Sequence, residues 1–301
     1  MPQVLDDLPE GARFVIIRLR SLGDCVLTTP AVRILKQYRP DLQIGVVVEN
    51  RFAPVFEGNP DVSAILEPVL KDLRAWKPRF VLNLHGGTRS VTMAAGSGAP
   101  AAGYAHHSGS WVYRVKIPRA QEILGEERTV HTAEHLASAV FYLGAKRVPV
   151  PRASLFAPRL PAQKPYAIIH PFAALPEKTW PAERFLAVAD HLRQQALEPW
   201  FIGGPGDDFA PFAGYRHLTN APLKDVMSAL QSATLFVGND SGPAHMAAAF
   251  GVPVVALFGP SDPVVWAPWR TESQVFASAD GIAAISVDTV VGAVDQLRVA
   301  Q

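Results

Sequence analysis

The sequence predicts an α/β protein made of two Rossmann-like, doubly wound domains, and three observations support this prediction. Short apolar runs alternate with helical stretches along almost the whole chain of 301 residues. The alternation stops at a proline-rich stretch, residues 148–165, and then starts again. The length suits two domains, and a hydrophobic content of 49% can fill two cores.

The first half of the chain predicts one complete domain, over residues 1–155. Its strands are short, apolar and rich in β-branched residues, and its helices carry apolar or small residues at helical spacing. The predicted strands are Phe14–Leu19, Gln43–Val48, Ser63–Leu66, Phe80–Leu84 and Ala101–Tyr104, and the predicted helices are Cys25–Tyr38, Thr88–Ala95 and Thr132–Leu143.

The second half predicts a domain of the same architecture, over residues 156–301. The segment that connects the two domains, residues 148–165, is expected to contain one short strand, Ala153–Phe156. The last helix could pack either on its own domain or back on the N-terminal domain. The predicted strands are Tyr166–His170, Trp200–Gly203, His217–Thr219, Leu235–Val237 and Val252–Phe258, and the predicted helices are Ala182–Gln195, Leu223–Gln231 and one that follows Ser241.

Composition excludes several classes of function. The 28 Lys and Arg residues balance 27 Asp and Glu residues, so the chain has no large net positive charge that would attract nucleic acid. The single cysteine, Cys25, cannot form an internal disulfide, and no Cys/His spacing indicates a zinc site. The sequence shows no signal peptide or membrane span, so we expect a cytoplasmic protein, with contact at most at the cytoplasmic face of the inner membrane.

The stretch LFVGNDSGPAHMAAAFGVPVVALFGPSDP, residues 235–263, predicts a strand, a loop, a helix and a second strand. Asp240 and Ser241 are good N-cap residues, and Gly242 and Pro243 suit the first turn. The free N–H groups and the positive dipole end of such a turn attract phosphate. The alternative is that the two residues only cap a core helix.

Two loops of the predicted sheets carry further candidates. Asp24 begins the first helix, where its carboxylate could accept a proton or only cap the helix. In the second domain Lys178 could clamp a diphosphate, or be a solvated surface lysine. Gly203, Gly204 and Pro205 end a strand, which would allow a nucleotide to approach the backbone or simply form a tight turn. No G-x-G-x-x-G fingerprint supports NAD binding.

Taken together, these motifs resemble glycosyltransferase family 9, the ADP-heptose:lipopolysaccharide heptosyltransferase family. The resemblance covers nearly the whole chain and rests on LRSLGDCVLTTPAVRILKQYRPDLQIGVVV, NLHGGTRS, KTWPAERF, IGGPGDD and the 235–263 stretch. It implies a GT-B fold, with two domains that face each other across a cleft. It also implies an inverting, metal-independent transferase without a cofactor, which moves a sugar, here heptose from ADP-heptose, to a lipopolysaccharide-core or related glycan.

The resemblance also implies a role for individual residues. Asp24 matches the general base, and Lys178 the residue that meets the donor phosphates. The loop of Asp240, Ser241 and Gly242 matches the donor site, with His245 behind it. The expected set for an anionic glycolipid acceptor is Arg20, Ser21, Gly23 and Arg89. From position alone, Arg114, Lys116 and Arg119 could extend this basic wall, or they could be scattered charges that keep the surface soluble. The chain departs from the family at Phe172-Ala173-Ala174, where a glycine-containing turn and a polar residue are usual.

The histidines His106, His107, His131 and His135 are expected to be structural, because no carboxylate cluster completes a metal site. Three alternatives to heptosyl transfer stay open: transfer from another nucleotide-sugar donor, a GT-B nucleotide-sugar epimerase, and a non-catalytic scaffold that binds nucleotide sugars. A transferase needs an acceptor, whereas an epimerase does not and a scaffold turns nothing over.

Overall fold

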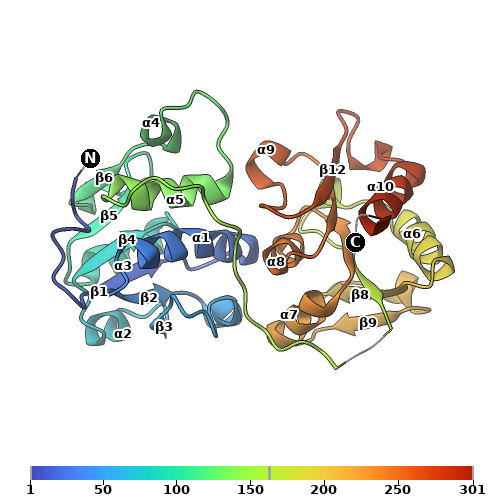
Figure 1. Cartoon of the computed structure of the whole chain (residues 1–301), viewed down its shortest axis with the longest axis horizontal. Coiled ribbons are helices and arrows are strands. Elements are labelled where there is room, and N and C mark those ends of the chain that lie inside the picture. The colour runs from blue at the N-terminus through green and yellow to red at the C-terminus, as the bar shows by residue number, and fades with distance from the viewer. Residues whose placement is uncertain (1, 162–163, 300–301) are drawn as a thin grey trace. The chain divides into compact units, whose positions relative to one another are not determined.

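The computed structural model describes residues 2–161 and 164–299 and divides into two compact units, shown in Figure 1. The N-terminal unit ends at Phe156 and the C-terminal unit begins at Ala157. Each unit is a parallel sheet with helices on both faces. Residues 162 and 163 of the predicted connecting segment lie outside the described residues.

The N-terminal sheet has six parallel strands in the order β3-β2-β1-β4-β5-β6. The central pair, β1 and β4, are almost wholly buried, as expected for strands covered on both faces. The strands are β1 (Arg13–Ile17), β2 (Gln43–Val47), β3 (Ala64–Leu66), β4 (Phe80–Asn83), β5 (Ala101–Tyr104) and β6 (Val115–Ile117).

The C-terminal sheet repeats this order. Read from one edge, it runs β9-β8-β7-β10-β11-β12, so that β7 and β10 occupy the places of β1 and β4. The strands are β7 (Tyr166–His170), β8 (Glu198–Gly203), β9 (Arg216–Thr219), β10 (Leu235–Asn239), β11 (Val254–Phe258) and β12 (Ser273–Ala277). In both sheets the winding therefore reverses between the two central strands, and the carboxyl ends of such strands are where ligands bind.

The helices form layers on the two faces of each sheet. In the N-terminal unit α1 packs against α5, while α2 and α3 cover the face that carries Val15 and Val81. In the C-terminal unit α6 and α10 share one core, and α7 packs against α8. The helices are α1 (Leu22–Tyr38), α2 (Leu70–Ala75), α3 (Thr88–Gly96), α4 (Ala120–Leu124), α5 (Thr132–Tyr142), α6 (Ala182–Gln194), α7 (Leu223–Ser232), α8 (Gly242–Phe250), α9 (Pro263–Trp266) and α10 (Val287–Val299).

Helix α1 shows how a buried helix tolerates a proline. Pro30 has no N–H for the carbonyl of Val26, and the hydroxyl of Thr29 donates to that carbonyl instead, at 2.8 Å. The same hydroxyl accepts the backbone N–H of Ser154, at 3.0 Å, which ties the end of the unit to α1. This helix can therefore run unbroken from the candidate base to Tyr38.

The structure differs from the sequence-based expectations in several elements. The predicted strand Ala153–Phe156 is wrong, because this segment forms no strand and joins neither sheet. The last helix, α10, places its apolar side chains Val290, Val294 and Leu297 in the C-terminal core. The short elements α2, β6, α4, α9 and β12 were not predicted. Among the described residues no helix is long and apolar enough to cross a membrane.

Candidate active site

The candidate base, Asp24, lies in the first turn of α1, directly after the central strand β1. The hydroxyl of Ser21, the N-cap residue, donates to one carboxylate oxygen at 2.9 Å. A guanidinium nitrogen of Arg18 lies 3.4 Å from the other oxygen. The side chain is 26% exposed, so a hydroxyl group of a substrate can reach a carboxylate that is held at both oxygens.

Arg18 was missed in the sequence analysis, although a charged residue at the end of the apolar run FVII was a usable signal. The whole residue is only 5% exposed. Its one ion pair among the described residues is the long contact with Asp24, and its Nε has no hydrogen-bond partner. Gly23, next to Asp24 in the first turn of α1, is also buried. It therefore supports the turn and does not present a surface to the acceptor.

The predicted acceptor residues Arg20 and Arg89 line one pocket of about 170 Å³. Arg89 lies 3.4 Å from a Glu49 carboxylate oxygen and donates to the carbonyl of Pro68 at 3.3 Å, although its side chain is 58% exposed. His85 lies in the same wall, together with the glycines that precede α3. The pocket thus joins the ends of β1 and β4, the place where ligands bind in this fold.

A larger pocket, of about 250 Å³, lies at the opposite edge of the sheet, at the amino ends of β4, β5 and β6. Arg114 lines it, beside Arg79 and Phe80. The expected grouping of Arg114 with Arg89 is therefore wrong, because the two arginines lie at opposite ends of parallel strands. We favour the smaller pocket because it lies at the carboxyl ends of β1 and β4, where sheets of this kind bind ligands.

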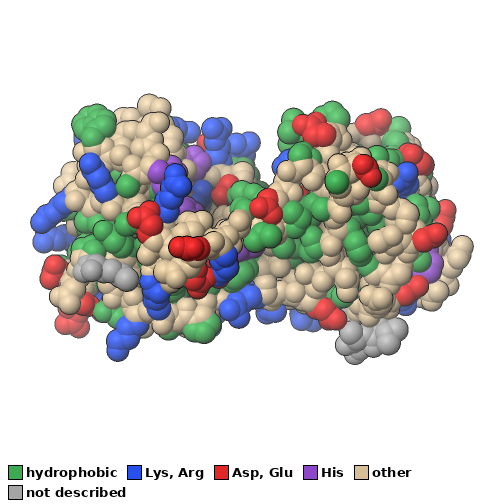
Figure 2. Space-filling view, turned by 90° about the horizontal axis from the view of Figure 1, so that it is seen from above, with side chains coloured by type: hydrophobic (Ala, Val, Ile, Leu, Met, Phe, Trp, Pro, Cys, Tyr) green, Lys and Arg blue, Asp and Glu red, His purple; other side chains and the backbone are tan. Residues whose placement is uncertain are grey.

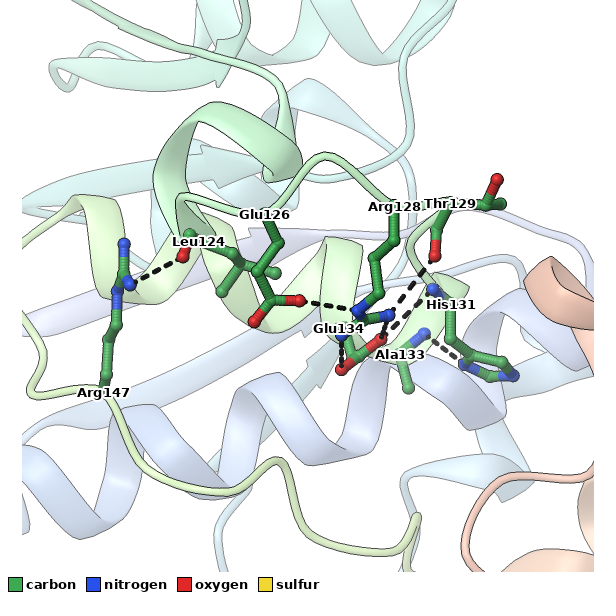
Figure 3. A network of polar contacts seen from close by, with 8 residues as sticks. All are labelled: Leu124, Glu126, Arg128, Thr129, His131, Ala133, Glu134 and Arg147. Atoms are coloured by element: carbon green, nitrogen blue, oxygen red, sulfur yellow. Dashed lines mark hydrogen bonds and ion pairs between the residues drawn. The ribbon is translucent and has the colours of Figure 1, made fainter.

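The histidines that we expected to be structural divide into two kinds. His131 caps α5: its ring accepts the N–H of Ala133 at 3.0 Å, in the polar network of Figure 3. In that network Arg128 also joins Glu126 and Glu134. His106, His107 and His135 instead gather around Tyr104. Among the described residues no group of three His, Cys, Asp or Glu side chains could hold a metal ion.

In the C-terminal unit the structure brings Lys178 and Asp240 together. Lys178 ends a short 3-10 helix, Pro176–Lys178, in the connection between β7 and α6. Its ammonium lies 3.7 Å from a carboxylate oxygen of Asp240, the residue after β10, and the side chains are 29% and 11% exposed. The lysine therefore faces the carboxyl edge of the sheet, rather than being a solvated surface residue.

A buried asparagine holds this connection in place. Asn239, at the end of β10, accepts the N–H of Trp180 at 3.1 Å and donates to the carbonyl of Pro171 at 2.9 Å. Trp180 is fully buried, and its indole donates to the carbonyl of Ile285 at 3.0 Å. Gly259 completes the support, because a Cβ at this position would lie 2.3 Å from the carbonyl oxygen of Glu177. The sequence analysis missed Asn239 and Gly259.

Helix α8 leaves its first turn open toward the same edge. Ser241 is its N-cap residue, but no side chain caps the helix, and the first turn, with Gly242 and Pro243, contains no acidic residue. The hydroxyl of Ser241 lies 3.1 Å from Nδ1 of His170, and burial lowers the pKa of this histidine to about 4. The anion site at this edge is therefore the positive end of the α8 dipole, and the neutral His170 ring adds no charge to it. His245 is buried in α8, with its ring 6.4 Å from that of Trp266.

The glycine turn after β8 packs closely against protein. A Cβ at Gly203 would lie 2.7 Å from the ring of Phe172 and 2.8 Å from Asp207. The N–H of Gly204 donates to the same Asp207 carboxylate at 2.7 Å. These contacts fit the tight-turn alternative for Gly203, Gly204 and Pro205. Phe172, which packs against this turn, is the first residue of the segment in which the chain departs from its family.

The overall structure is that of a GT-B glycosyltransferase. It superposes on a glycosyltransferase of family 9 from Veillonella parvula with a TM-score of 0.85 and 24% identity, covering 96% of this chain and 98% of that one. It superposes on the E. coli ADP-heptose lps heptosyltransferase II with a TM-score of 0.82 and 18% identity, covering 96% and 99%. The predicted fold is thereby confirmed.

The sequence places the chain within a family. Residues 68–288 match the profile of glycosyltransferase family 9 (heptosyltransferase), and the chain belongs to this family. Among its relatives is lipopolysaccharide heptosyltransferase 3 of Escherichia coli K12, with 27% identity over 83% of each chain. The resemblance stated from the motifs is confirmed, and the protein is a glycosyltransferase enzyme.

Proposed function

We propose that the protein transfers heptose from ADP-heptose to a sugar hydroxyl of a lipopolysaccharide-core or related anionic glycan, with inversion and without a bound metal. The names of its relatives, which include a lipopolysaccharide heptosyltransferase and an ADP-heptose heptosyltransferase, support this donor and acceptor. The observation that carries the proposal is the Asp24 carboxylate, held by Ser21 and Arg18 at the end of β1.

On the acceptor side, Asp24 acts as the general base. It takes the proton of the acceptor hydroxyl while that oxygen forms a bond to the anomeric carbon of the donor. The bond from this carbon to the diphosphate oxygen breaks on the opposite face, and ADP leaves with both bonding electrons. A single displacement of this kind inverts the anomeric centre. Arg20, Ser21 and Arg89 would hold the acceptor, and the buried Gly23 would support the turn that carries Arg20 and Ser21.

On the donor side, charge grows on the diphosphate as it leaves. Lys178 and the open N-terminus of α8 are the groups that would stabilise this charge, and so would take the place of a metal ion. Asp240, as an anion, would accept hydrogen bonds from sugar hydroxyls. In this proposal the lysine exchanges its contact with Asp240 for one with phosphate. Ser241 to Pro243 line the donor site, and His245 supports it from α8.

The test measures ADP release and glycan product with ADP-heptose in the presence and absence of a lipopolysaccharide-core acceptor. We expect release only with acceptor and loss of release in Asp24→Asn. Rearranged sugar without acceptor would indicate an epimerase, and donor binding without turnover would indicate a scaffold. Either result contradicts the proposal. Parallel assays with UDP- and GDP-sugars test the donor, and excess chelator tests metal independence.

A further inference from the structure

Three histidines with no part in the proposed transfer surround one buried tyrosine at the carboxyl edge of the N-terminal sheet. The ring centroid of Tyr104 lies 4.4 Å from that of His135 and 5.3 Å from that of His107, and His106 lies 4.5 Å from His107. His106 and His107 follow β5, whereas His135 belongs to α5, so only the fold unites them. Figure 2 shows histidine side chains beside Lys and Arg side chains on a face of the N-terminal unit.

Two rings of the histidine cluster, which consists of His106, His107 and His135, are influenced by burial and by the charge of Arg18, the residue that pairs with the candidate base. Burial is the main cause that lowers the pKa of His107 and His135, the latter to about 4, and the charge of Arg18 lowers both further. The same two causes lower the pKa of His85. His107 also packs over the turn after His85, since a Cβ at Gly86 would lie 2.5 Å from its Nδ1. The ends of β1, β4 and β5 therefore converge on one place.

Two buried polar atoms at this place have no hydrogen-bond partner among the described residues. Arg18 is 5% exposed, yet it makes one long ion pair, and its Nε has no partner among the described residues. Nδ1 of His85 is likewise buried without a partner. A guanidinium offers five N–H donors, and leaving a buried donor unsatisfied is unfavourable. A buried cation that is so sparsely paired indicates a place for an anion.

We propose that Arg18, His85 and the histidine cluster form a subsite, beside Asp24, for an anionic substituent of the acceptor, a carboxylate or a phosphate. This inference rests on the proposed acceptor and names how that acceptor is recognised. Burial disfavours protonation of His85, His107 and His135 by lowering their pKa values, and a bound anion favours it, so binding takes up protons. The charged and titratable groups at the subsite are Arg18, Arg20, Asp24, Tyr104 and the four histidines, and Glu49 and Arg89 line the pocket wall beside His85.

The direct test follows the histidine ring signals by NMR during titration with sulfate, whose charge stays constant where histidine titrates. We expect sulfate to raise the pKa of His107 and His85. Its affinity should increase as the pH falls, by up to about tenfold per pH unit for each proton taken up. A parallel titration with acetate distinguishes carboxylate from phosphate recognition. Histidine signals of the subsite that do not respond to either anion would overturn the proposal.

Two variants separate this subsite from general effects of charge. His107→Asn should abolish the pH dependence of sulfate binding, whereas the exposed His217→Asn should retain it. In the transfer assay His107→Asn should raise the acceptor KM and leave kcat and the donor KM unchanged. Because the anion titration needs neither donor nor acceptor, its result does not depend on the proposed reaction. Equal pH dependence in both variants would contradict the subsite.

Discussion

The two units share one strand order but place different chemistry at the same edge. In the N-terminal unit α1 begins five residues after β1 ends, and its first turn carries a carboxylate, Asp24. In the C-terminal unit a long connection between β7 and α6 carries Lys178, and the first turn of α8 contains no acidic residue. We therefore expect the first edge to accept a proton and the second, where Lys178 pairs with Asp240, to accept an anion. The fold supplies the edge, and the loops determine the chemistry.

The supports of these two edges are alike. Asn83 and Asn239 are the last residues of β4 and β10, which occupy the same place in the two sheets, and both are buried. Asn83 accepts the N–H of His85 at 3.0 Å and donates to Tyr113 at 2.8 Å. Asn239 spans the connection that carries Lys178. A buried asparagine thus stands at the same place in both sheets, with different partners in each.

The largest effect is expected from removing the base at the edge of the N-terminal sheet. Asp24→Asn keeps the shape of the side chain but removes its basicity, so turnover should fall by about 10²- to 10⁴-fold with an unchanged donor KM. Initial rates of ADP release measure both. Asp72→Asn, at a matched position in the first turn of α2, is the control and should keep full activity. Undiminished turnover in Asp24→Asn would remove Asp24 as the base.

The second effect belongs to the other edge. Lys178→Ala removes the cation that meets the leaving diphosphate, so transfer should fall by about 10²-fold and the donor KM should rise. The acceptor KM should stay constant. The exposed Lys164→Ala, in the same unit, controls for a general loss of positive charge. An acceptor KM that changes instead would reverse the assignment of the two edges.

A pH effect on stability should come from His170. Burial lowers its pKa from 6.5 to about 4, so the unfolded chain binds the proton more tightly. The stabilisation is complete above pH 6.5 and is lost as the pH falls toward 4, by roughly 3 kcal/mol. Urea unfolding across this range measures it, and His170→Gln should have a flatter profile. Identical profiles for the two proteins would show that His170 does not titrate on unfolding.

The paired asparagines allow a direct comparison. Asn239→Leu leaves the Trp180 N–H and the Pro171 carbonyl unsatisfied, and Asn83→Leu does the same to the N–H of His85, at a cost of about 1–3 kcal/mol each. Beyond this shared loss of stability, Asn239→Leu should weaken donor binding and Asn83→Leu acceptor binding. Urea unfolding and the two KM values test this prediction. If both variants weaken the same substrate, the supports are not specific to their edges.

The smallest expected effect tests the departure from the family at residues 172–174. Ala173→Ser restores a hydroxyl in the connection that carries Lys178, and one added hydrogen bond to phosphate should tighten ADP binding by about 2- to 10-fold. Calorimetric titration with ADP measures it. Ala213→Ser, at an exposed position of the same unit, should have no effect. Weaker binding of ADP by Ala173→Ser would show that Phe172 and its neighbours already fill the space.

Local pattern predicted most of the winding, because buried parallel strands and amphipathic helices carry strong periodic signals. It failed for β6 and β12, where a short or half-polar segment becomes a strand only beside a neighbour, and for Ala153–Phe156, which has strand character but no partner. The same limit holds for the site. Asp24 and Lys178 lie in motifs, whereas the gathering of His106 and His107 with His135 depends on the adjacency of β5 and α5 in space.

The central claim, that the C-terminal unit binds the donor nucleotide and the N-terminal unit supplies the base, is tested most directly by calorimetric titration of ADP into three proteins. Wild-type protein and Asp24→Asn should bind ADP with equal affinity, and Lys178→Ala should bind it much more weakly. UDP and GDP should bind less tightly than ADP to all three. Loss of ADP binding in Asp24→Asn, or undiminished binding in Lys178→Ala, would contradict this division of the two edges.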